Sequence, residues 1–416
     1  MRIDNEIARI LKHCKSADLI DENDQTLVFC DFAILHEKIQ NIQGQLPENS
    51  LCAVAIKSNP LLGVIKEIER SGAGVEAASI AEVQLALSAG FSPERIVFDS
   101  PVKTKADIQF CLNHFKGGLL NADSIEELEN LPVDVPFSLG LRVNPAVEIK
   151  TVASMNVSGK QSKFGEWMTL SHRDKLQFLA ERKGLNTLHV HQGSQSTDYS
   201  GMVNGIKAVI EMAQKINEIV GFEKITQIDI GGGFPVNYKD DNAFDIAVYF
   251  DLLRTNCPEL FDGTFRVITE FGRYVQAHAG FVVTEVHTVK KDQEPKMAII
   301  HVGADMFLRE SYNPDDWYHR LDKLNADFSC SMEQKETYTI GGPLCFGGDI
   351  PFRNAEVKTL KKNDWLIIYD TGANSYALWS RHCSTFFPKC IAIHTDGKLE
   401  IIKKKETFED IKNFWS

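Results

Sequence analysis

The chain has 416 residues, more than the roughly 100 to 200 that one domain usually takes, so we expect two domains or one large barrel with an addition. Hydrophobic residues make up 43% of the sequence and charged residues 25%, which excludes disordered, low-complexity and collagen-like chains. The net charge of -12 argues against a general nucleic-acid or anionic-membrane surface and leaves room for a local basic pocket, so small-molecule chemistry is expected.

Eight short apolar runs between residues 51 and 271, each bounded by turn residues, predict buried β-strands. In chain order they are LCAVAIK (51–57), GVEAAS (74–79), RIVFDS (95–100), GGLLNA (117–122), FSLGLRV (137–143), NTLHVHQ (186–192), ITQIDIG (225–231) and FRVITEF (265–271). Between them lie longer stretches with apolar residues three and four apart, which predict amphipathic helices. This alternation favours a parallel (β/α)₈ TIM barrel, and an open doubly wound α/β sheet is the alternative.

After about residue 278 the sequence turns to β-rich runs without long helices, such as FVVTEVHTV, KMAIIHVG and DWLIIYD. We therefore expect a barrel domain over residues 35–278 and a mostly β domain over residues 279–416. Residues 1–34 hold one short helix and the strand-like TLVFCDF. Because they precede the barrel strands, we expect this segment to pack with the β domain.

No run of residues approaches the roughly 18 apolar positions of a membrane span, and the first residues lack the apolar stretch of a signal peptide. The expectation is a cytoplasmic protein without a membrane partner. The nine cysteines are scattered, odd in number and never in a C-x-x-C pair, which argues against disulfides and structural zinc. A small buried hydrophobe is the default expectation for any one of them, whereas the Gly- and Pro-rich loop around Cys345, GGPLCFGGD, favours a side chain that is presented rather than packed.

The predicted strand ends are unusually polar, and in a (β/α)₈ barrel the active site lies at the C-terminal ends of the strands. In chain order these positions are Lys57, Glu76, Ser79, Arg142, Asn144, His191, Gly231, Gly232, Gly233, Glu270 and Arg273. Their expected convergence at one mouth of the barrel is stronger evidence for a site than any one of them.

Three glycines after the seventh strand indicate a phosphate site. Backbone amides of Gly231, Gly232 and Gly233 can approach an oxyanion closely, and the loops after strands seven and eight are the usual phosphate site of this barrel. Phe234 follows where a dinucleotide fold needs the G-x-G-x-x-G spacing, so a Rossmann site is excluded. A tight turn is the alternative for the glycines alone, and Arg273 in the next loop favours the phosphate.

Lys57 is a candidate for covalent chemistry, because burial at a strand end opposes the charge of a lysine that has no partner or task. Together with a phosphate site it suggests pyridoxal phosphate (PLP), held by the phosphate at one end and by an imine with Lys57 at the other. Glu270 could pair with the pyridinium nitrogen, and His191 could stack on the ring. The alternatives are a core histidine for His191, an ion pair with Arg273 for Glu270, and a solvent-reaching amine for Lys57.

At this point a family resemblance emerges from an ordered set of motifs across both expected domains. The motifs are IKSN (56–59), GVEAAS (74–79), IVFDSPVKT (96–104), LRVNP (141–145), SKFG (162–165), HQGSQ (191–195), DIGGGFP (229–235), EFGRYV (270–275), ADMFLRESY (304–312), GGPLCFGGD (341–349) and DTGANSYAL (370–378). They resemble the fold-type III PLP-dependent decarboxylases, which include the diaminopimelate, ornithine, arginine and carboxynorspermidine enzymes. The resemblance implies an alanine-racemase-like barrel, a C-terminal β domain, and a head-to-tail homodimer with two shared active sites.

The resemblance also implies cofactor roles for the matching positions. Lys57 would bind PLP as an imine, His191 would stack on the pyridine, and Glu270 would hold its nitrogen. The residues that would bind the phosphate are Ser194, Gly232, Gly233, Arg273 and Tyr376. The common G-A-Y of the family reads Gly372, Ala373, Asn374 here, so the family tyrosine is missing. We expect Tyr376, two residues further on, to replace it.

On the substrate side, the resemblance implies that Arg309 holds a carboxylate that is not lost and that Cys345 reaches the partner subunit's active site. Tyr312 and Phe346 would lie beside the substrate. Phe346 stands where the diamino-acid enzymes usually carry an acidic residue that pairs with the distal amine of the substrate. RHCS at 381–384 also departs from the Asn-rich segment expected in a diaminopimelate enzyme.

The sequence therefore predicts a PLP-dependent α-decarboxylase of a basic or diamino acid or of an N-substituted derivative, such as a citryl-diamino acid in siderophore or polyamine biosynthesis. An acylated or alkylated distal nitrogen needs no acidic partner, which suits Phe346. The alternatives are an amino-acid racemase of the same fold, in which an arginine would stand in place of Glu270, and a non-catalytic PLP-binding regulatory homologue. A metal-dependent hydrolase has only His189 and His191 as a hint, and no metal is expected.

Overall fold

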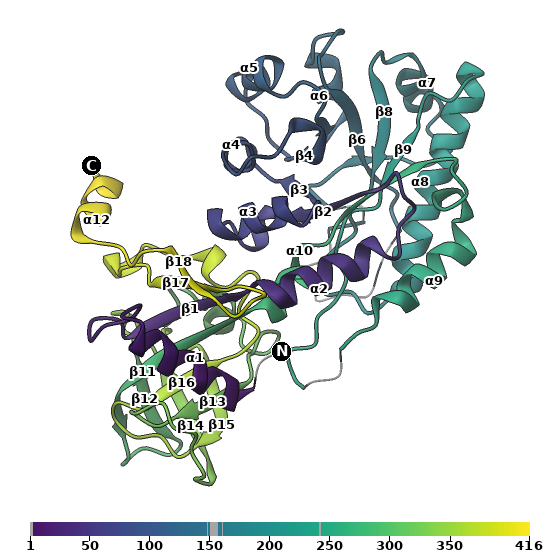
Figure 1. Cartoon of the computed structure of the whole chain (residues 1–416). Coiled ribbons are helices and arrows are strands. Elements are labelled where there is room, and N and C mark those ends of the chain that lie inside the picture. The colour runs from purple at the N-terminus through teal and green to yellow at the C-terminus, as the bar shows by residue number, and fades with distance from the viewer. Residues whose placement is uncertain (1–2, 148, 150–156, 160, 241–242) are drawn as a thin grey trace. The chain divides into compact units, whose positions relative to one another are not determined.

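A computed structural model describes the chain except residues 1–2, 148, 150–156, 160 and 241–242. Its contacts divide the chain into two compact units, which are both visible in Figure 1. The barrel unit comprises His36–Val236 and Ala243–Val275, and the β unit comprises Met1–Leu35, Asn237–Asn242 and Gln276–Ser416. The segment that begins at Asn237, which the sequence placed within the barrel domain, is thus grouped with the β unit.

The eight predicted strands form a closed parallel barrel. They are β2 (Leu51–Ala55), β3 (Gly74–Ala77), β4 (Ile96–Asp99), β5 (Leu119–Ala122), β6 (Ser138–Asn144), β8 (Leu185–His189), β9 (Gln227–Asp229) and β10 (Arg266–Glu270). Each pairs with the next, and β10 returns to β2 with Glu270 opposite Ala53. This closure confirms the TIM barrel and excludes the open doubly wound sheet. A two-residue strand that the sequence did not predict, β7 (Glu166–Trp167), pairs in parallel with the C-terminal end of β6.

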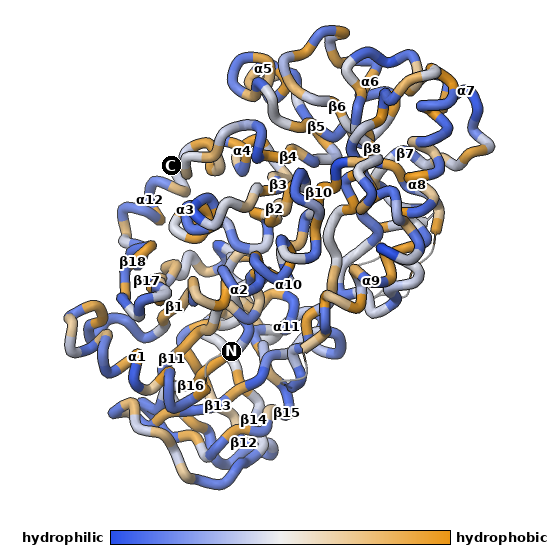
Figure 2. The backbone as a smooth tube through the Cα atoms, turned by 45° about the vertical axis from the view of Figure 1, so that its right-hand side comes forward, coloured by the Kyte–Doolittle hydropathy of each residue, from blue (hydrophilic) through white to orange (hydrophobic). Residues whose placement is uncertain are grey.

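The helices of the barrel unit lie around the outside of the strands (Figure 1). They are α3 (Leu62–Arg70), α4 (Ile80–Ser88), α5 (Lys105–His114), α6 (Ile125–Asn130), α7 (Arg173–Glu181), α8 (Tyr199–Val220), α9 (Ile246–Asn256) and the short α10 (Gly272–Gln276). Figure 2 shows polar and apolar stretches alternating along them, as expected for helices with one face on the sheet. Local signals set their ends: Thr104 caps α5 in a capping box with Asp107, and α8 ends at Gly221 in the left-handed conformation.

Apolar side chains close the barrel at the N-terminal ends of its strands. Leu51, Val97, Leu119 and Ile268, with Ala53 beside them, form one buried cluster. The first four barrel strands are buried along their whole length. Because this end is filled with hydrocarbon, the polar residues of the strands are left to gather at the opposite, C-terminal mouth.

The β unit is built on a nine-stranded sheet. Its strands are β1 (Thr26–Asp31), β11 (Gly280–Lys290), β12 (Lys296–Ile300), β13 (Leu321–Leu324), β14 (Lys335–Gly341), β15 (Phe352–Lys358), β16 (Trp365–Ile368), β17 (Lys389–Ile393) and β18 (Leu399–Lys403). The N-terminal β1 lies inside this sheet, antiparallel to β11 and parallel to β17. Helix α2 (Phe32–Gln43) follows β1 directly. Two further short helices are α11 (Leu308–Tyr312), between β12 and β13, and α12 (Phe408–Trp415), after β18.

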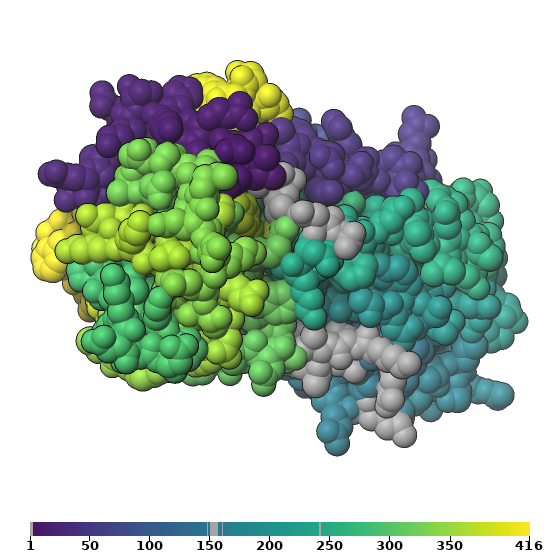
Figure 3. All heavy atoms as spheres, turned by 90° about the horizontal axis from the view of Figure 1, so that it is seen from below, coloured from purple at the N-terminus to yellow at the C-terminus, as the bar shows by residue number. Residues whose placement is uncertain are grey.

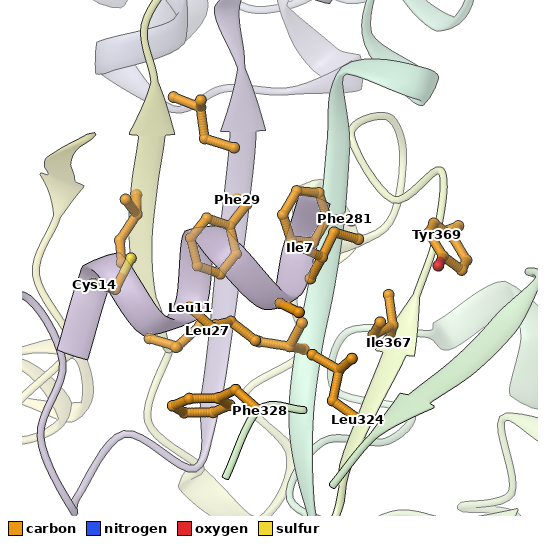
Figure 4. Close-up of a cluster of buried hydrophobic side chains, with 14 residues drawn as sticks. Ile7, Leu11, Cys14, Leu27, Phe29, Phe281, Leu324, Phe328, Ile367 and Tyr369 are labelled. Atoms are coloured by element: carbon orange, nitrogen blue, oxygen red, sulfur yellow. The ribbon is translucent and has the colours of Figure 1, made fainter. Parts of the chain in front are cut away.

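Helix α1 (Asp4–Ser16) covers one face of this sheet. Its Ile7, Leu11 and Cys14 are fully buried against Phe29 of β1 and Phe281 of β11, whose rings stack with centroids 4.7 Å apart (Figure 4). Figure 3 shows the N-terminal residues, in purple, packed against green and yellow residues of the β unit. In the part of the chain that the structure describes, no helix has both the length and the apolar character needed to cross a membrane.

Candidate active site

The predicted site residues fall into two groups, one in each unit. The barrel unit carries Lys57, His191, Ser194, Gly232, Gly233, Glu270 and Arg273, all at the C-terminal ends of strands or in the segments that directly follow them, with Arg273 in the short helix α10. The β unit carries Arg309, Tyr312, Cys345, Phe346 and Tyr376.

Lys57 lies two residues beyond the end of its strand, in the short 3₁₀ segment Ile56–Ser58 that follows β2. Its side chain is 47% exposed, and its Nζ donates to Oε2 of the fully buried Glu76 of β3 at 2.6 Å. Burial opposes the charge of this ammonium group, but Glu76, Glu270 and Asp99 outweigh that effect and raise the pKa of Lys57. Glu76 therefore orients the amine while the amine stays open to the barrel mouth.

Glu270 ends β10 as a buried carboxylate, with its side chain 2% exposed. Burial, together with the nearby Asp229, raises the pKa of Glu270 well above its usual range. Among the described residues its Oε1 has no hydrogen-bond partner. A buried acceptor of this kind calls for a donor that the protein itself does not supply.

His189 joins Glu270 to two further carboxylates beneath the barrel mouth. Its Nδ1 lies 3.2 Å from Oδ2 of Asp229, and its Nε2 lies 3.5 Å from Oδ2 of Asp99 and 3.9 Å from Oε2 of Glu270. Burial alone would lower the pKa of His189, but the three carboxylates outweigh it and raise that pKa well above its usual value. The three carboxylates thus favour the protonated form of the buried His189.

Arg142, at the mouth end of β6, completes this buried network. Its Nη1 donates to Oδ2 of Asp99 at 2.9 Å, and both side chains are buried. Burial would raise the pKa of Asp99, but the guanidinium of Arg142 and the ring of His189 outweigh it and lower that pKa. Asp99 is therefore a carboxylate held between two cations.

His191 has the opposite character from His189, two residues earlier. Burial, reinforced by the charges of Arg142 and Lys57, holds the pKa of His191 well below its usual value. Its Nδ1 accepts the N–H of Gly232 at 3.0 Å, so the neutral ring carries its proton on Nε2. A neutral imidazole with this fixed orientation is suited to stack on a cationic aromatic ring without charge repulsion.

The glycine segment after β9 has no room for side chains. A Cβ on Gly232 would lie 2.4 Å from the carbonyl oxygen of Glu270, and one on Gly233 would lie 2.1 Å from that of Gly193. Gly233 also has a φ of +98°, which side-chain-bearing residues rarely adopt. Nearby, Nε of the buried Arg273 donates to Oγ of Ser194 at 3.3 Å. Backbone amides, a hydroxyl and a guanidinium are the groups that bind phosphate.

In the β unit, an aromatic cluster surrounds the predicted substrate residues. The exposed Tyr312 stacks on Phe346 with ring centroids 6.0 Å apart, and His382 meets Phe346 edge-on at 5.5 Å. Arg309 lies over the ring of Trp317, 4.9 Å from its centroid. Phe346 therefore presents an apolar, aromatic surface beside Cys345.

Two further predicted residues of the β unit differ in exposure. Cys345 is exposed, and its backbone N–H donates to Sγ of Cys383 at 3.4 Å. Tyr376 is buried, 3% exposed, with its hydroxyl 3.6 Å from Sγ of Cys30. The replacement of the family tyrosine by Tyr376 stays a prediction.

Three residues of this buried network were not predicted as part of the cofactor site: Asp99, Asp229 and His189. Asp99 and Asp229 each end a barrel strand, like the polar positions that were selected. His189 was noted only as a hint of a metal site. Asp99, His189 and Glu270 do bring ligand-type atoms within 4.8 Å of one another. Because Arg142 and Asp229 already pair with two of the three, we interpret the group as an ion-pair network.

The barrel residues fit the expected cofactor. The buried Oε1 of Glu270 is an acceptor that suits a pyridinium N–H, and the glycine segment with Ser194 and Arg273 suits a phosphate. Lys57 presents an amine at the mouth, and His191 is a neutral ring of fixed orientation. PLP carries a phosphate, an aldehyde and a pyridine nitrogen, and each of these groups has a matching residue here.

Comparison with known proteins gives the same assignment. Residues 33–277 match the family model described as the pyridoxal-binding domain of pyridoxal-dependent decarboxylases. Among curated relatives, diaminopimelate decarboxylase of Helicobacter pylori is 27% identical over 373 residues, covering 87% of this chain and 88% of that protein. The enzyme of the same name from Archaeoglobus fulgidus is 25% identical over 415 residues, covering 95% and 94% of the two chains.

Solved structures show the same fold at low sequence identity. Diaminopimelate decarboxylase from Helicobacter pylori, complexed with L-lysine, aligns with a TM-score of 0.85 at 23% identity, covering 96% of this chain and 99% of that one. Lysine/ornithine decarboxylase from Vibrio vulnificus, complexed with putrescine, aligns with a TM-score of 0.77 at 21% identity, covering 94% and 98%. With the matched family model and the cofactor site described above, the chain belongs to the pyridoxal-dependent decarboxylases and is a PLP-dependent amino-acid carboxy-lyase.

Proposed function

We propose that this enzyme removes the α-carboxylate of a basic or diamino acid, or of an N-substituted derivative of one, in a homodimer with shared active sites. The proposed reaction rests on one observation: Glu270 is buried, and its Oε1 has no hydrogen-bond partner among the described residues. The names of the relatives support the substrate class, because they are diaminopimelate and lysine/ornithine decarboxylases.

When bound, PLP supplies an aldehyde that takes up the amino group covalently and a protonated ring that accepts the electron pair left by carbon dioxide. Glu270 keeps the ring nitrogen protonated by accepting its N–H in a buried site. An arginine in this position, as expected in a racemase, would leave the ring less protonated and a weaker electron acceptor. The carboxylate therefore favours decarboxylation.

Lys57 and Glu76 lie at the other end of the cofactor site, where the amine must react. Glu76 holds Nζ of Lys57 in position at 2.6 Å. Because an amine is nucleophilic only when neutral, and the nearby carboxylates stabilise its charge, Lys57 acts only after its proton has been given up. His191 covers the ring, and Arg273, Ser194, Gly232 and Gly233 hold the phosphate. In the β unit, Tyr376 assists with the phosphate and Arg309 binds a carboxylate that the substrate retains.

Phe346 supports the finer proposal about the substrate. In the loop 341–349 the only acidic residue is Asp349, and its two oxygens accept the backbone N–H groups of Ala304 and Leu344, both at 2.6 Å. Beside Phe346 stand the rings of Tyr312 and His382. Because this loop offers an aromatic surface and an occupied carboxylate, an acylated or alkylated distal nitrogen suits it better than a free ammonium. Such substrates occur in siderophore and polyamine biosynthesis.

A substrate panel tests this proposal. Carbon dioxide release should be measured with meso-diaminopimelate, L- and D-ornithine, L-lysine, L-arginine, carboxynorspermidine and citryl-diamino acids. We expect the highest kcat/KM for a member whose distal nitrogen is substituted. Efficient turnover of meso-diaminopimelate alone would refute the interpretation of Phe346 and leave the decarboxylase assignment intact.

Complementation tests the shared site. If Cys345 acts at the partner subunit's Lys57, each heterodimer of Cys345→Ala and Lys57→Ala has one site with both defects and one wild-type site. Random subunit exchange between the two inactive variants should then restore roughly a quarter of wild-type activity. Activity no higher than that of the separate variants, after exchange has been verified by a mass tag, would place both residues in one chain's site.

A further inference from the structure

Two exposed cysteines, distant in the sequence, lie side by side in the β unit. Cys345 lies in the loop between β14 and β15, and Cys383 in the segment His382–Ser384 that precedes β17. The N–H of Cys345 donates to Sγ of Cys383 at 3.4 Å. Of the nine cysteines these two alone are exposed, whereas Cys330 is half-buried and the other six are buried.

The backbone nitrogen of Cys345 lies close to the sulfur of Cys383. An N–Cα bond is about 1.46 Å long, so Cα of Cys345 lies no farther than about 4.9 Å from Sγ of Cys383. Sγ of Cys345 is two bonds from that Cα, and rotation about its Cα–Cβ bond moves it between staggered positions. Disulfides join cysteines whose Cα atoms are usually 4.4 to 6.8 Å apart. Rotation of the two side chains moves the sulfur atoms and leaves the Cα atoms in place, so the bond requires this rotation together with a small adjustment of the two exposed loops.

The loop that carries Cys345 and the segment that carries Cys383 are both hydrogen-bonded to the turn at Ala304 and Asp305. Asp349, four residues after Cys345, accepts the N–H of Ala304. Next to Ala304, Asp305 accepts the hydroxyl of Thr385 through Oδ2 at 2.8 Å, and its carbonyl accepts the N–H of Ser380 at 2.8 Å. The segment around Cys383 is thus fixed at both ends to the same turn that anchors the loop of Cys345.

The backbone of Cys383 is itself unusual. Its φ is +58°, and that of Ser384 is +52°, so two successive residues with side chains adopt the left-handed region. Such conformations persist only where surrounding contacts enforce them. Here they direct the sulfur of Cys383 toward the backbone of Cys345.

We propose that Cys345 and Cys383 form a reversible intramolecular disulfide when the enzyme meets a peroxide. The thiolate of one cysteine attacks the O–O bond, so an S–O bond forms, the O–O bond breaks, and one oxygen leaves as water after protonation. The other thiol attacks that sulfur, an S–S bond forms, the S–O bond breaks, and a second water leaves. The two thiols give up two electrons and two protons, and the peroxide is reduced to two waters. Exchange with a small thiol restores both cysteines.

The consequence for catalysis rests on the proposed function, because it requires Cys345 to act on the substrate. The disulfide would remove this thiol from the reaction and tether the neighbouring Phe346. A site that admits an amino acid also admits a peroxide, so Cys345 stays accessible to the oxidant when it faces an active site. Formation of the disulfide does not depend on that role.

The test uses the full-length protein loaded with PLP and treated with hydrogen peroxide. After free thiols are blocked with iodoacetamide, peptide mapping should show residues 345 and 383 joined within one chain, and dithiothreitol should release them. Titration of accessible thiols under native conditions should fall by two per chain and then recover. Cys383→Ser should give no cross-linked peptide, whereas the matched control Cys330→Ser should behave as the wild type.

The outcomes separate this proposal from the proposed function. Separate oxidation of Cys345 and Cys383 to sulfinic acids, or a disulfide between two chains, would overturn the intramolecular pair. With a substrate from the panel, peroxide should abolish turnover of the wild type reversibly, while Cys383→Ser should lose the recovery by dithiothreitol or resist inactivation. A mapped 345–383 disulfide with unchanged turnover would establish the modification and refute the catalytic role of Cys345. Circular dichroism melts verify that each variant is folded.

Discussion

Replacing His189 with glutamine should destabilise the barrel unit, and most strongly at low pH. The glutamine keeps a polar side chain but removes the cation that stands between Asp229, Asp99 and Glu270. Breaking a buried ion pair by removal of one partner costs about 3 to 5 kcal/mol. For a domain of this size each kcal/mol shifts the Tm by about 2 to 4 °C, so the expected decrease is roughly 6 to 20 °C.

The pH dependence follows from the direction of the shift. The pKa of His189 is raised in the folded state above its ordinary value of about 6.5. Its proton therefore stabilises the folded state fully below about pH 6.5, and this contribution is lost as the pH rises through the folded pKa. The difference in Tm between wild type and His189→Gln should be largest near pH 6 and should shrink toward pH 9.

The assay is thermal unfolding of protein stripped of PLP, because bound cofactor would add its own stabilisation. The matched control is His114→Gln, a histidine exposed at the end of α5 in the same unit, which should leave the Tm within about 1 °C of the wild type. A deficit that is equal at both pH values, or that grows with pH, would refute the buried imidazolium.

Three further predictions concern the cofactor site. Lys57→Ala should abolish decarboxylation and leave the fold intact, and borohydride reduction of the wild type should place the pyridoxyl label on Lys57; a label on another lysine would overturn the assignment. Glu270→Gln should retain PLP but lower kcat on the order of a hundredfold, because a neutral amide does not hold the pyridinium proton; unchanged kcat would exclude this role. Gly233→Ala should weaken PLP binding at least about tenfold in equilibrium dialysis because its Cβ meets Gly193, whereas Gly263→Ala, at a similar φ with open space around it, should bind PLP normally.

The barrel could be predicted because each of its strands carries a local signal. Runs such as LCAVAIK and RIVFDS are apolar and bounded by turn residues, and all eight appear as strands of the closed sheet. Their ends were placed less accurately. Lys57 was expected as the last residue of a strand, but the strand ends at Ala55 and the chain turns into a 3₁₀ segment. Hydropathy marks burial, and it does not mark where neighbouring strands diverge at the mouth.

The partners of the site residues could not be predicted, because they depend on which strands are neighbours. Lys57 and Glu76 are 19 residues apart, and they meet only because β2 and β3 pair in register. Cys383 was expected to be a buried hydrophobe, and that expectation was wrong, because it lies in an exposed loop, as Cys345 does. Their pairing depends on the turn at Asp305, which no local pattern reveals.

The charge at the barrel mouth shows why the buried residues belong to the cofactor site as much as the exposed ones. Four carboxylates, Glu76, Asp99, Asp229 and Glu270, and three cations, Lys57, Arg142 and His189, are linked by the ion pairs described above. In this set the acidic groups exceed the basic ones by one, and Glu76, Asp99 and Glu270 each keep one oxygen without a hydrogen-bond partner among the described residues. A buried excess of one negative charge is unfavourable in the protein alone, which raises the pKa of Glu270. A bound pyridinium cation would supply the missing charge and a donor for Oε1 of Glu270, so this network of buried carboxylates favours the protonated ring that decarboxylation requires.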